Sequence, residues 1–211
     1  MHCAAHMNQN PDLTFENELW SAYRFIAGLD EAGRGALAGP VFVGTVILPD
    51  DHPHLARTLI GVRDSKQLTP RRRSALVPQI REAALASGIG FASAEEIDRM
   101  GIVPATRLAA SRALESLHIF PDYLLTDFRL ELPEVDIHQT AIVKGDAISL
   151  TIACASVLAK TARDEWMCGL SSEYPEYDFS RHKGYGTSLH RNMIGALGHS
   201  PIHRKTFKLK K

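Results

Sequence analysis

The chain has 211 residues, of which 45% are hydrophobic and 23% charged, and its formal net charge at pH 7 is zero. These values are ordinary for one globular domain with a substantial core. The longest weakly polar stretch, residues 148–159, is too short to span a bilayer, and no secretory signal is visible. Cys3, Cys154 and Cys168 have neither paired nor zinc-like spacing. We therefore expect a reducing compartment, the cytoplasm, and no structural metal.

The predicted elements, in chain order, describe an α/β domain. Five short segments are expected to be strands: residues 25–29, 41–48, 89–92, 122–127 and 139–143, of which 41–48 is rich in β-branched and apolar residues. Segments with apolar residues at helical spacing are expected to be helices: residues 70–86, a short helix opened by the capping-box sequence 93–96, 104–117 and 148–170. Gly88 is interpreted as the break after the first helix. Strands that then alternate with helices predict a mixed sheet.

Two adjacent acids, Asp30 and Glu31, end the first apolar run and precede a glycine loop. Adjacent strand residues point to opposite faces, so the two serve one centre only if the chain bends or a ligand draws them together. A divalent cation does this. Gly33 and Gly35 permit close backbone approach to a ligand, and Arg34 offers a guanidinium suited to phosphate. Taken alone, this motif is more often a solvated turn beside a flexible loop.

Six segments resemble, in the same order, the motifs of ribonuclease HII, the type 2 ribonuclease H. They are residues 28–41, 64–68, 141–146, 155–164, 182–187 and 201–204. The resemblance covers about residues 25–207, and six ordered motifs are far more specific than any one alone. It implies a ribonuclease H-like mixed sheet flanked by helices, in which an antiparallel hairpin continues into parallel strands, with a small C-terminal helical substrate-binding segment.

The resemblance also divides the chain. Residues 1–24 are expected to be an N-terminal extension, 25–180 the catalytic core and 181–211 a basic substrate-binding segment. A second Met at position 7 makes the first residues resemble an expression remnant or a stretch before an alternative start, so they are left out of the fold prediction. Ribonuclease HIII is the near rival, but about 24 residues before the first strand are too few for its additional N-terminal domain.

The resemblance implies an endonuclease that hydrolyses the RNA strand of RNA/DNA hybrids and cuts at ribonucleotides embedded in duplex DNA, leaving 3′-hydroxyl and 5′-phosphate ends. The implied cofactor is Mg²⁺ or Mn²⁺, and no protein partner is indicated. The implied catalytic residues and metal ligands are Asp30, Glu31, Asp127 and Asp164. Two cations about 4 Å apart activate the attacking water and stabilise the leaving oxygen in such enzymes.

Two of these acids have competing interpretations. Asp127 is followed by Phe128, where the family usually has glycine, and a bulky residue there would shift the loop or crowd the substrate. This departure motivates the alternative of a catalytically silent hybrid-binding protein. Asp164 lies four residues after Lys160, the spacing of an ordinary helical ion pair, although both are also expected on a phosphate-facing helix surface with Arg163. Asp146 is interpreted as a loop or cap residue and is left out of the ligand set.

Substrate recognition is expected from other residues. By resemblance, Gly33, Arg34 and Gly35 grip the ribose at the junction, and Tyr185 stacks on the following deoxyribose. The alternative for Tyr185 is a half-buried aromatic in a turn. Candidate phosphate contacts, each equally interpretable as a solvated charge, are Lys66, Lys144, Lys183 and Arg204. The glycine loop lacks the spacing of nucleotide-binding glycine motifs.

The zero net charge conceals an asymmetry. Residues 181–211 contain eight Lys and Arg and no Asp or Glu, so this segment carries +8 and the preceding 180 residues carry −8. Aromatic and histidine side chains are interspersed among these charges. The pattern favours polyanion binding over a solvated tail and predicts a salt-dependent affinity without sequence preference.

Overall fold

The computed structural model describes residues 10–128 and 130–208 of the chain. Its centre is a five-stranded sheet with the strand order β3-β2-β1-β4-β5. The strands are β1 (Ile26–Ala32), β2 (Val41–Ile47), β3 (Ala86–Ala92), β4 (Tyr123–Asp127) and β5 (His138–Ile142). β1 to β3 pair antiparallel, whereas β4 pairs parallel with both β1 and β5. The predicted mixed sheet, with an antiparallel hairpin that continues into parallel strands, is confirmed.

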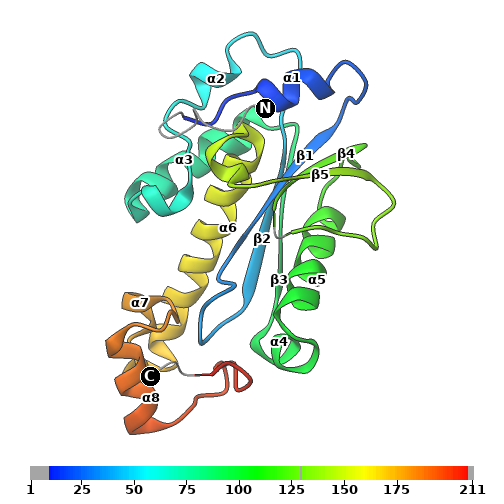
Figure 1. Cartoon of the computed structure of the whole chain (residues 1–211). Coiled ribbons are helices and arrows are strands. Elements are labelled where there is room, and N and C mark those ends of the chain that lie inside the picture. The colour runs from blue at the N-terminus through cyan, green and yellow to red at the C-terminus, as the bar shows by residue number, and fades with distance from the viewer. Residues whose placement is uncertain (1–9, 129, 209–211) are drawn as a thin grey trace.

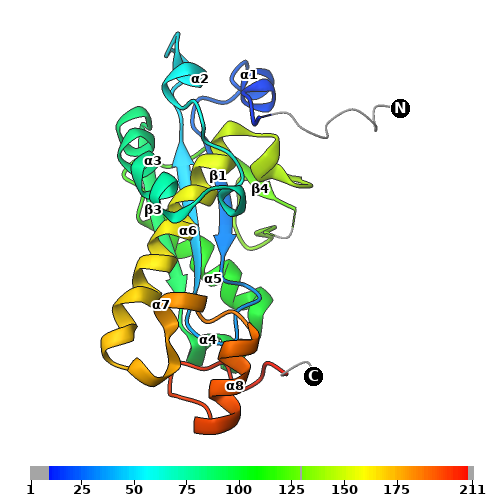
Figure 2. The same ribbon diagram turned by 90° about the vertical axis from the view of Figure 1, so that its left-hand side faces the viewer.

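Helices cover both faces of this sheet (Figures 1 and 2). The α-helices are α1 (Thr14–Leu19), α2 (Leu55–Thr58), α3 (Pro70–Ala83), α4 (Ala94–Met100), α5 (Ile102–Glu115), α6 (Leu150–Gly169), α7 (Phe179–His182) and α8 (Ser188–Leu197). One apolar cluster joins α5 to its face of the sheet, and a second joins α3 and α6 to the other. None of the helices in the described ranges is long and apolar enough to cross a membrane.

The strand β3 begins earlier than the sequence pattern predicted. The helix expected over residues 70–86 ends at Ala83, and β3 begins at Ala86. Gly88 is therefore not a helix break, and its assignment as one was wrong. A Cβ at Gly88 would lie 2.6 Å from a backbone oxygen of α5, and one at Gly90 would lie 2.1 Å from another. Both glycines permit close packing of α5 on the sheet.

The strand β1 is longer than predicted, and this changes the position of the two acids. It extends through Ala32, so Asp30 and Glu31 lie within the strand rather than after it. Glycines on β1 and β2 bring α6 very close to the sheet: a Cβ at Gly28 would lie 2.5 Å from the α6 backbone, and one at Gly44 would lie 2.4 Å from it. Since Asp30 is two residues after Gly28, its side chain faces the same helix.

The ends of the described chain lie at opposite ends of α6 (Figure 1). Near the N-terminus, α1 is held by the buried Glu16, whose Oε1 accepts hydrogen bonds from the Ser149 hydroxyl at 2.6 Å and the Thr151 N–H at 3.0 Å. The helices α7 and α8 pack at the far end of α6, where Met167 joins Phe179 in a small apolar cluster. The predicted domain limits stay a prediction, and residues 1–9 and 209–211 lie outside the described residues.

Candidate active site

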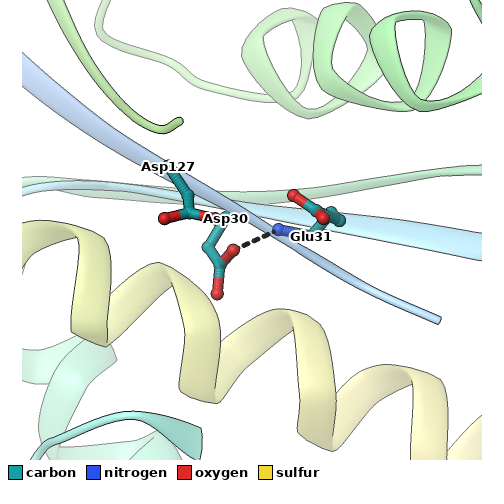
Figure 3. A group of neighbouring side chains, drawn as sticks. All are labelled: Asp30, Glu31 and Asp127. Carbon is teal, nitrogen blue, oxygen red and sulfur yellow. Dashed lines mark hydrogen bonds between the residues drawn. The ribbon is translucent and has the colours of Figure 1, made fainter. Parts of the chain in front are cut away.

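Three carboxylates meet where β1 and β4 run side by side. Leu29 is paired with Thr126, so Asp30 and Asp127 come next on the two parallel strands. One carboxylate oxygen each from Asp30, Glu31 and Asp127 lies within 4.8 Å of the other two (Figure 3). The structure therefore brings together three of the four acids that the sequence selected.

The negative charges of these three carboxylates are only partly balanced by neighbouring positive charges and hydrogen-bond donors. Asp30 is only 3% exposed, and burial, followed by the charge of Glu31, raises its pKa well above the usual range. Burial also raises the pKa of Glu31, against the opposing charge of Arg34. Asp30 Oδ1 accepts the Glu31 N–H at 2.8 Å, but Asp30 Oδ2 and Glu31 Oε2 are buried without a partner among the described residues. Repelling, unpartnered carboxylate oxygens are the donor set that a hard divalent cation requires, so the residues fit such an ion.

The fourth predicted ligand, Asp164, lies outside this group. Its two carboxylate oxygens are each held by a cation: Arg73 Nη2 is 2.7 Å from Oδ2, and Lys160 Nζ is 2.5 Å from Oδ1. The ion pair with Lys160 is the one that the helical spacing indicated. The predicted role of Asp164 as a ligand stays a prediction.

Asp146, which was not selected as a ligand, interacts with the acidic group through its charge. Its charge contributes to the raised pKa of Asp30, and its own pKa is raised to about 6 by burial and by the charges of Asp64 and Asp127. Lys66 Nζ is 3.8 Å from its Oδ2. The assignment of Asp146 as a loop residue thus overlooked its neighbours.

The sheet topology is the signal that would have indicated this position. β5 runs parallel to β4, so the chain leaves β5 at the sheet edge where Asp127 ends β4. Gly145 follows β5 closely and donates its N–H to Asp127 Oδ1 at 3.0 Å. An acid directly after Gly145 therefore reaches the same edge.

A cavity of about 440 Å³ opens beside the acids. Its lining contains most of the predicted substrate contacts together with residues that the sequence did not select: Glu31, Ala32, Gly33, Arg34, Gly35, Ser65, Lys66, Arg73, Lys160 and Tyr185. Lys144 is exposed and does not line it. Tyr185 is partly buried, with Lys160 Nζ 5.2 Å from its ring centroid.

Two arginines expected to contact phosphate are buried. Arg163 is 0% exposed and Arg204 is 1% exposed. Both donate hydrogen bonds to backbone carbonyls: Arg163 Nε to Pro40 at 3.0 Å and Arg204 Nε to Gly39 at 2.9 Å. Their expected phosphate contacts are therefore wrong, because neither guanidinium is accessible to a substrate.

Phe128 does not displace the acid that precedes it. Its side chain is 54% exposed, and its N–H donates to the Ile142 carbonyl at 3.0 Å. Asp127 keeps its place in the acidic group with Phe128 beside it. Phe128 thus leaves Asp127 in place, and the expected shift of the loop or crowding of the substrate stays a prediction.

A mixed sheet of this order, flanked by helices and bearing acids on its central strands, defines the ribonuclease H-like class. Solved structures agree. A ribonuclease H2 from Pyrococcus horikoshii is 26% identical with a TM-score of 0.72, covering 88% of this chain and 94% of that chain. A structure of the PCNA:RNase HII complex from Archaeoglobus fulgidus gives the same identity and TM-score, covering 89% and 96%.

Sequence comparison defines the family. The family model for ribonuclease HII matches residues 27–210. A ribonuclease HII of Dehalococcoides mccartyi is 49% identical over 199 residues, covering 93% of this chain and 92% of the relative. The chain belongs to the ribonuclease HII family. It is a metal-dependent ribonuclease H, a hydrolase with ribonuclease H activity on RNA/DNA hybrids, and the alternatives of ribonuclease HIII and of a silent binding protein are set aside.

Proposed function

We propose that the protein, besides hydrolysing the RNA strand of hybrids, cuts at single ribonucleotides embedded in duplex DNA and leaves 3′-hydroxyl and 5′-phosphate ends. The observation that carries the proposal is the acidic group beside a cavity lined by the glycine loop and Tyr185. A cleavage centre and an aromatic platform for a sugar thus share one cavity.

Asp30, Glu31 and Asp127 are the residues proposed to hold the metal. Mg²⁺ and Mn²⁺ both suit carboxylate oxygens. When bound, a pair of such ions activates the attacking water and stabilises the leaving oxygen in a phosphodiester cleavage. The chain contributes the spacing of the acids, because β1 and β4 are rigidly paired, and the Gly145 N–H that orients the Asp127 carboxylate at 3.0 Å.

We favour Asp146 over Asp164 as the fourth acid of this site. Asp146 shares the electrostatic environment of Asp30 and Asp127, and Lys66, at 3.8 Å, is its one ion-pair partner within the described part of the chain. Both oxygens of Asp164 are already bound. Its proposed part is to hold Arg73 and Lys160 on the cavity wall, where the charge of the less buried Lys160 faces a substrate phosphate.

Sugar selection is assigned to the glycine loop and Tyr185. Apart from its chain neighbours, no described residue comes within 4 Å of the position that a Cβ would take at Gly35, so its backbone is open to a ligand. A ribose 2′-hydroxyl both donates and accepts a hydrogen bond, and a close backbone can recognise it. The ring of Tyr185 then supports the neighbouring deoxyribose, while Lys66 and the exposed Lys144 supply charge along the backbone of the substrate.

We also propose that this protein binds a protein partner. One solved relative is described in complex with PCNA, whereas the sequence alone indicated no partner. A cytoplasmic location stays a prediction, in keeping with the free thiols of Cys154 and Cys168.

The experiment is a cleavage assay on duplex DNA that contains one ribonucleotide. The protein should cut it with Mg²⁺ or Mn²⁺ and not with EDTA, and the products should carry 3′-hydroxyl and 5′-phosphate ends. Cleavage of long hybrids without cleavage of this duplex would refute the embedded-ribonucleotide activity, and cleavage in EDTA would refute the role of the metal.

A further inference from the structure

The most completely buried cation of the described residues lies between two substrate elements. Arg163 on α6 is 0% exposed and forms no ion pair within the described ranges. Its guanidinium donates to the Pro40 carbonyl at 3.0 Å and to the Ala38 carbonyl at 3.2 Å. It also donates to the Lys183 carbonyl at 3.0 Å. One side chain therefore joins the chain after the glycine loop to the chain before Tyr185.

The same guanidinium contacts the recognition residues themselves. A Cβ at Gly33 would lie 1.8 Å from Arg163 Nε, so the glycine backbone rests directly on the guanidinium. On its other side, the Tyr185 ring centroid is 5.0 Å from Arg163 Cζ. Gly184 completes the junction, because its carbonyl accepts the Leu37 N–H at 2.8 Å. Arg163 is the side chain that contacts both the glycine loop and the ring, in addition to the backbone hydrogen bond between their segments.

Burial of a charge without a counter-ion is costly, and burial lowers the pKa of Arg163. Each of its three nitrogens donates to one backbone carbonyl, but carbonyls do not neutralise its charge. A neutral side chain would fill the same space at a lower desolvation cost. A planar group with donors in several fixed directions is required only if separate backbone segments must be held in one geometry.

We propose that Arg163 is a positioning residue that fixes the glycine loop relative to Tyr185 and thereby determines the preference for a single ribonucleotide in DNA. The inference rests on the proposed roles of the loop and of Tyr185. Arg163 does not touch the substrate in this account. It acts through the carbonyls of Ala38, Pro40 and Lys183 and through its contact with the ring.

The test compares two substrates with one enzyme preparation. For Arg163→Lys, kcat/KM is measured on duplex DNA with one ribonucleotide and on a long RNA/DNA hybrid. The ratio of the two values cancels the fraction of folded enzyme, so a loss of stability alone cannot change it. We expect the ratio to fall by about 10-fold or more, since misplacement by about 1 Å can reduce a rate by about 100-fold. The control is Arg112→Lys, which alters an arginine bound to Glu96 on α4 and should leave the ratio unchanged.

The same substitution in a Tyr185→Ala protein tests this inference separately from the proposed function on which it rests. In Tyr185→Ala protein, Arg163→Lys should lower the ratio much less, because the ring that it positions is gone. An unchanged ratio in Arg163→Lys, with a lowered ratio in Tyr185→Ala, would overturn the inference and leave the proposed function intact. An unchanged ratio in Tyr185→Ala would refute the sugar-selection role of Tyr185 and, with it, this inference.

Stability is controlled by a neutral variant. Arg163→Gln removes the buried charge and retains one donor group. If Arg163→Lys fails to fold, this neutral variant is still expected to fold. Its ratio should fall as well. If neither variant folds, Arg163 is a residue of the core and the positioning role is overturned.

Discussion

The two sides of the cavity carry buried charges of opposite sign, and they differ in how these charges are hydrogen-bonded. On the sheet side, Asp30, Glu31 and Asp127 bring negative charges within 4.8 Å, with buried oxygens that have no partner among the described residues. On the side of α6 and the C-terminal segment, Arg163 and Arg204 are buried positive charges that donate hydrogen bonds to backbone carbonyls, with Arg204 Nη2 left without a partner among the described residues. The acids are left to a ligand, whereas the arginines are bound by the fold.

This difference indicates a division of work. Unsatisfied acids depend on a cation and should govern the rate of cleavage. Arginines whose donors are bound by the backbone hold segments in place, and should govern which substrate is accepted. Substitutions on the two sides should therefore change different kinetic quantities.

The largest effect is expected on the acidic side. Asp30→Asn and Asp127→Asn should each lower turnover by orders of magnitude, because each removes a proposed metal ligand, while hybrid binding through phosphate contacts persists. Saturated turnover and equilibrium binding of a long hybrid measure the two quantities. The control is Glu134→Gln, since that carboxylate is exposed and pairs with Arg107. Near-normal turnover in Asp127→Asn would remove this residue from the site.

The next effect distinguishes Asp146 from Asp164, of which the sequence analysis selected only Asp164 as a ligand. Asp146→Asn should lower turnover by about 100-fold or more, because it removes the proposed fourth acid of the metal site and not only a residue that orients a ligand. Asp164→Asn should instead lower the free energy of unfolding by up to about 3 kcal/mol, because it leaves Arg73 and Lys160 without their counter-ion. Turnover and urea unfolding of both variants provide the comparison. A larger turnover loss in Asp164→Asn would restore it as the fourth ligand.

A smaller effect is expected on the recognition side. Tyr185→Ala should lose about 1 to 3 kcal/mol of stacking, mainly on a single ribonucleotide, because a continuous RNA strand offers no deoxyribose at most positions. The ratio of single-ribonucleotide to long-hybrid cleavage should drop. Phe120→Ala removes a 74% exposed aromatic and should leave the ratio unchanged. Equal losses on both substrates, with a lower melting temperature, would assign Tyr185 to the core.

Histidines behind Tyr185 form a hydrogen-bonded relay. His203 Nδ1 accepts the Ser200 N–H at 2.9 Å, so its other nitrogen, Nε2, is assigned as the donor to His190 Nε2 at 3.0 Å. His190 Nδ1 then donates to the Tyr185 carbonyl at 3.0 Å. Both rings must be neutral in this arrangement. The recognition side therefore has a hydrogen-bond network that protonation would break.

The smallest effect follows from the pH dependence of this relay. Burial, reinforced by neighbouring histidines, lowers the pKa of both His190 and His203 to about 4, from the usual 6.5. Because the unfolded chain binds the protons more readily, the contribution of the relay is complete above pH 6.5 and is lost as the pH falls toward 4. Urea midpoints measured between pH 7.5 and 5.0 should decline less in His203→Gln than in the parent. Equal declines would show that the relay does not titrate in this range.

The sequence predicted the sheet well because apolar periodicity and motif order both reflect the core. It failed where tertiary packing decided. Gly88 was interpreted from the sequence as a helix break. In the structure it lies in β3, and α5 packs so closely on it that only glycine fits. Likewise, the end of β1 could not be placed from its apolar run, because Asp30 and Glu31 continue the strand through backbone pairing with β2.

Prediction of the site had a similar limit. Asp30, Glu31 and Asp127 were selected from strand ends and motif order, and the structure brings them together, whereas Asp146, which we propose as the fourth acid, was passed over because its loop reaches them only when β5 lies beside β4. Helical spacing placed Lys160 and Asp164 on one face correctly, but Arg73, which binds the second oxygen of Asp164, is 91 positions away in the chain. Contacts of that kind depend on the fold and not on local pattern.

The central claim is that acids from β1 and β4 form the metal centre. Calorimetric titration of Mn²⁺ into the parent protein, Asp127→Asn and Asp164→Asn tests it directly. We expect the affinity to fall by more than about 100-fold in Asp127→Asn, above the loss of about 10- to 100-fold that is typical of outer partners of a metal, and to stay near the parent value in Asp164→Asn. Unchanged affinity in Asp127→Asn, with a loss in Asp164→Asn, would contradict the account.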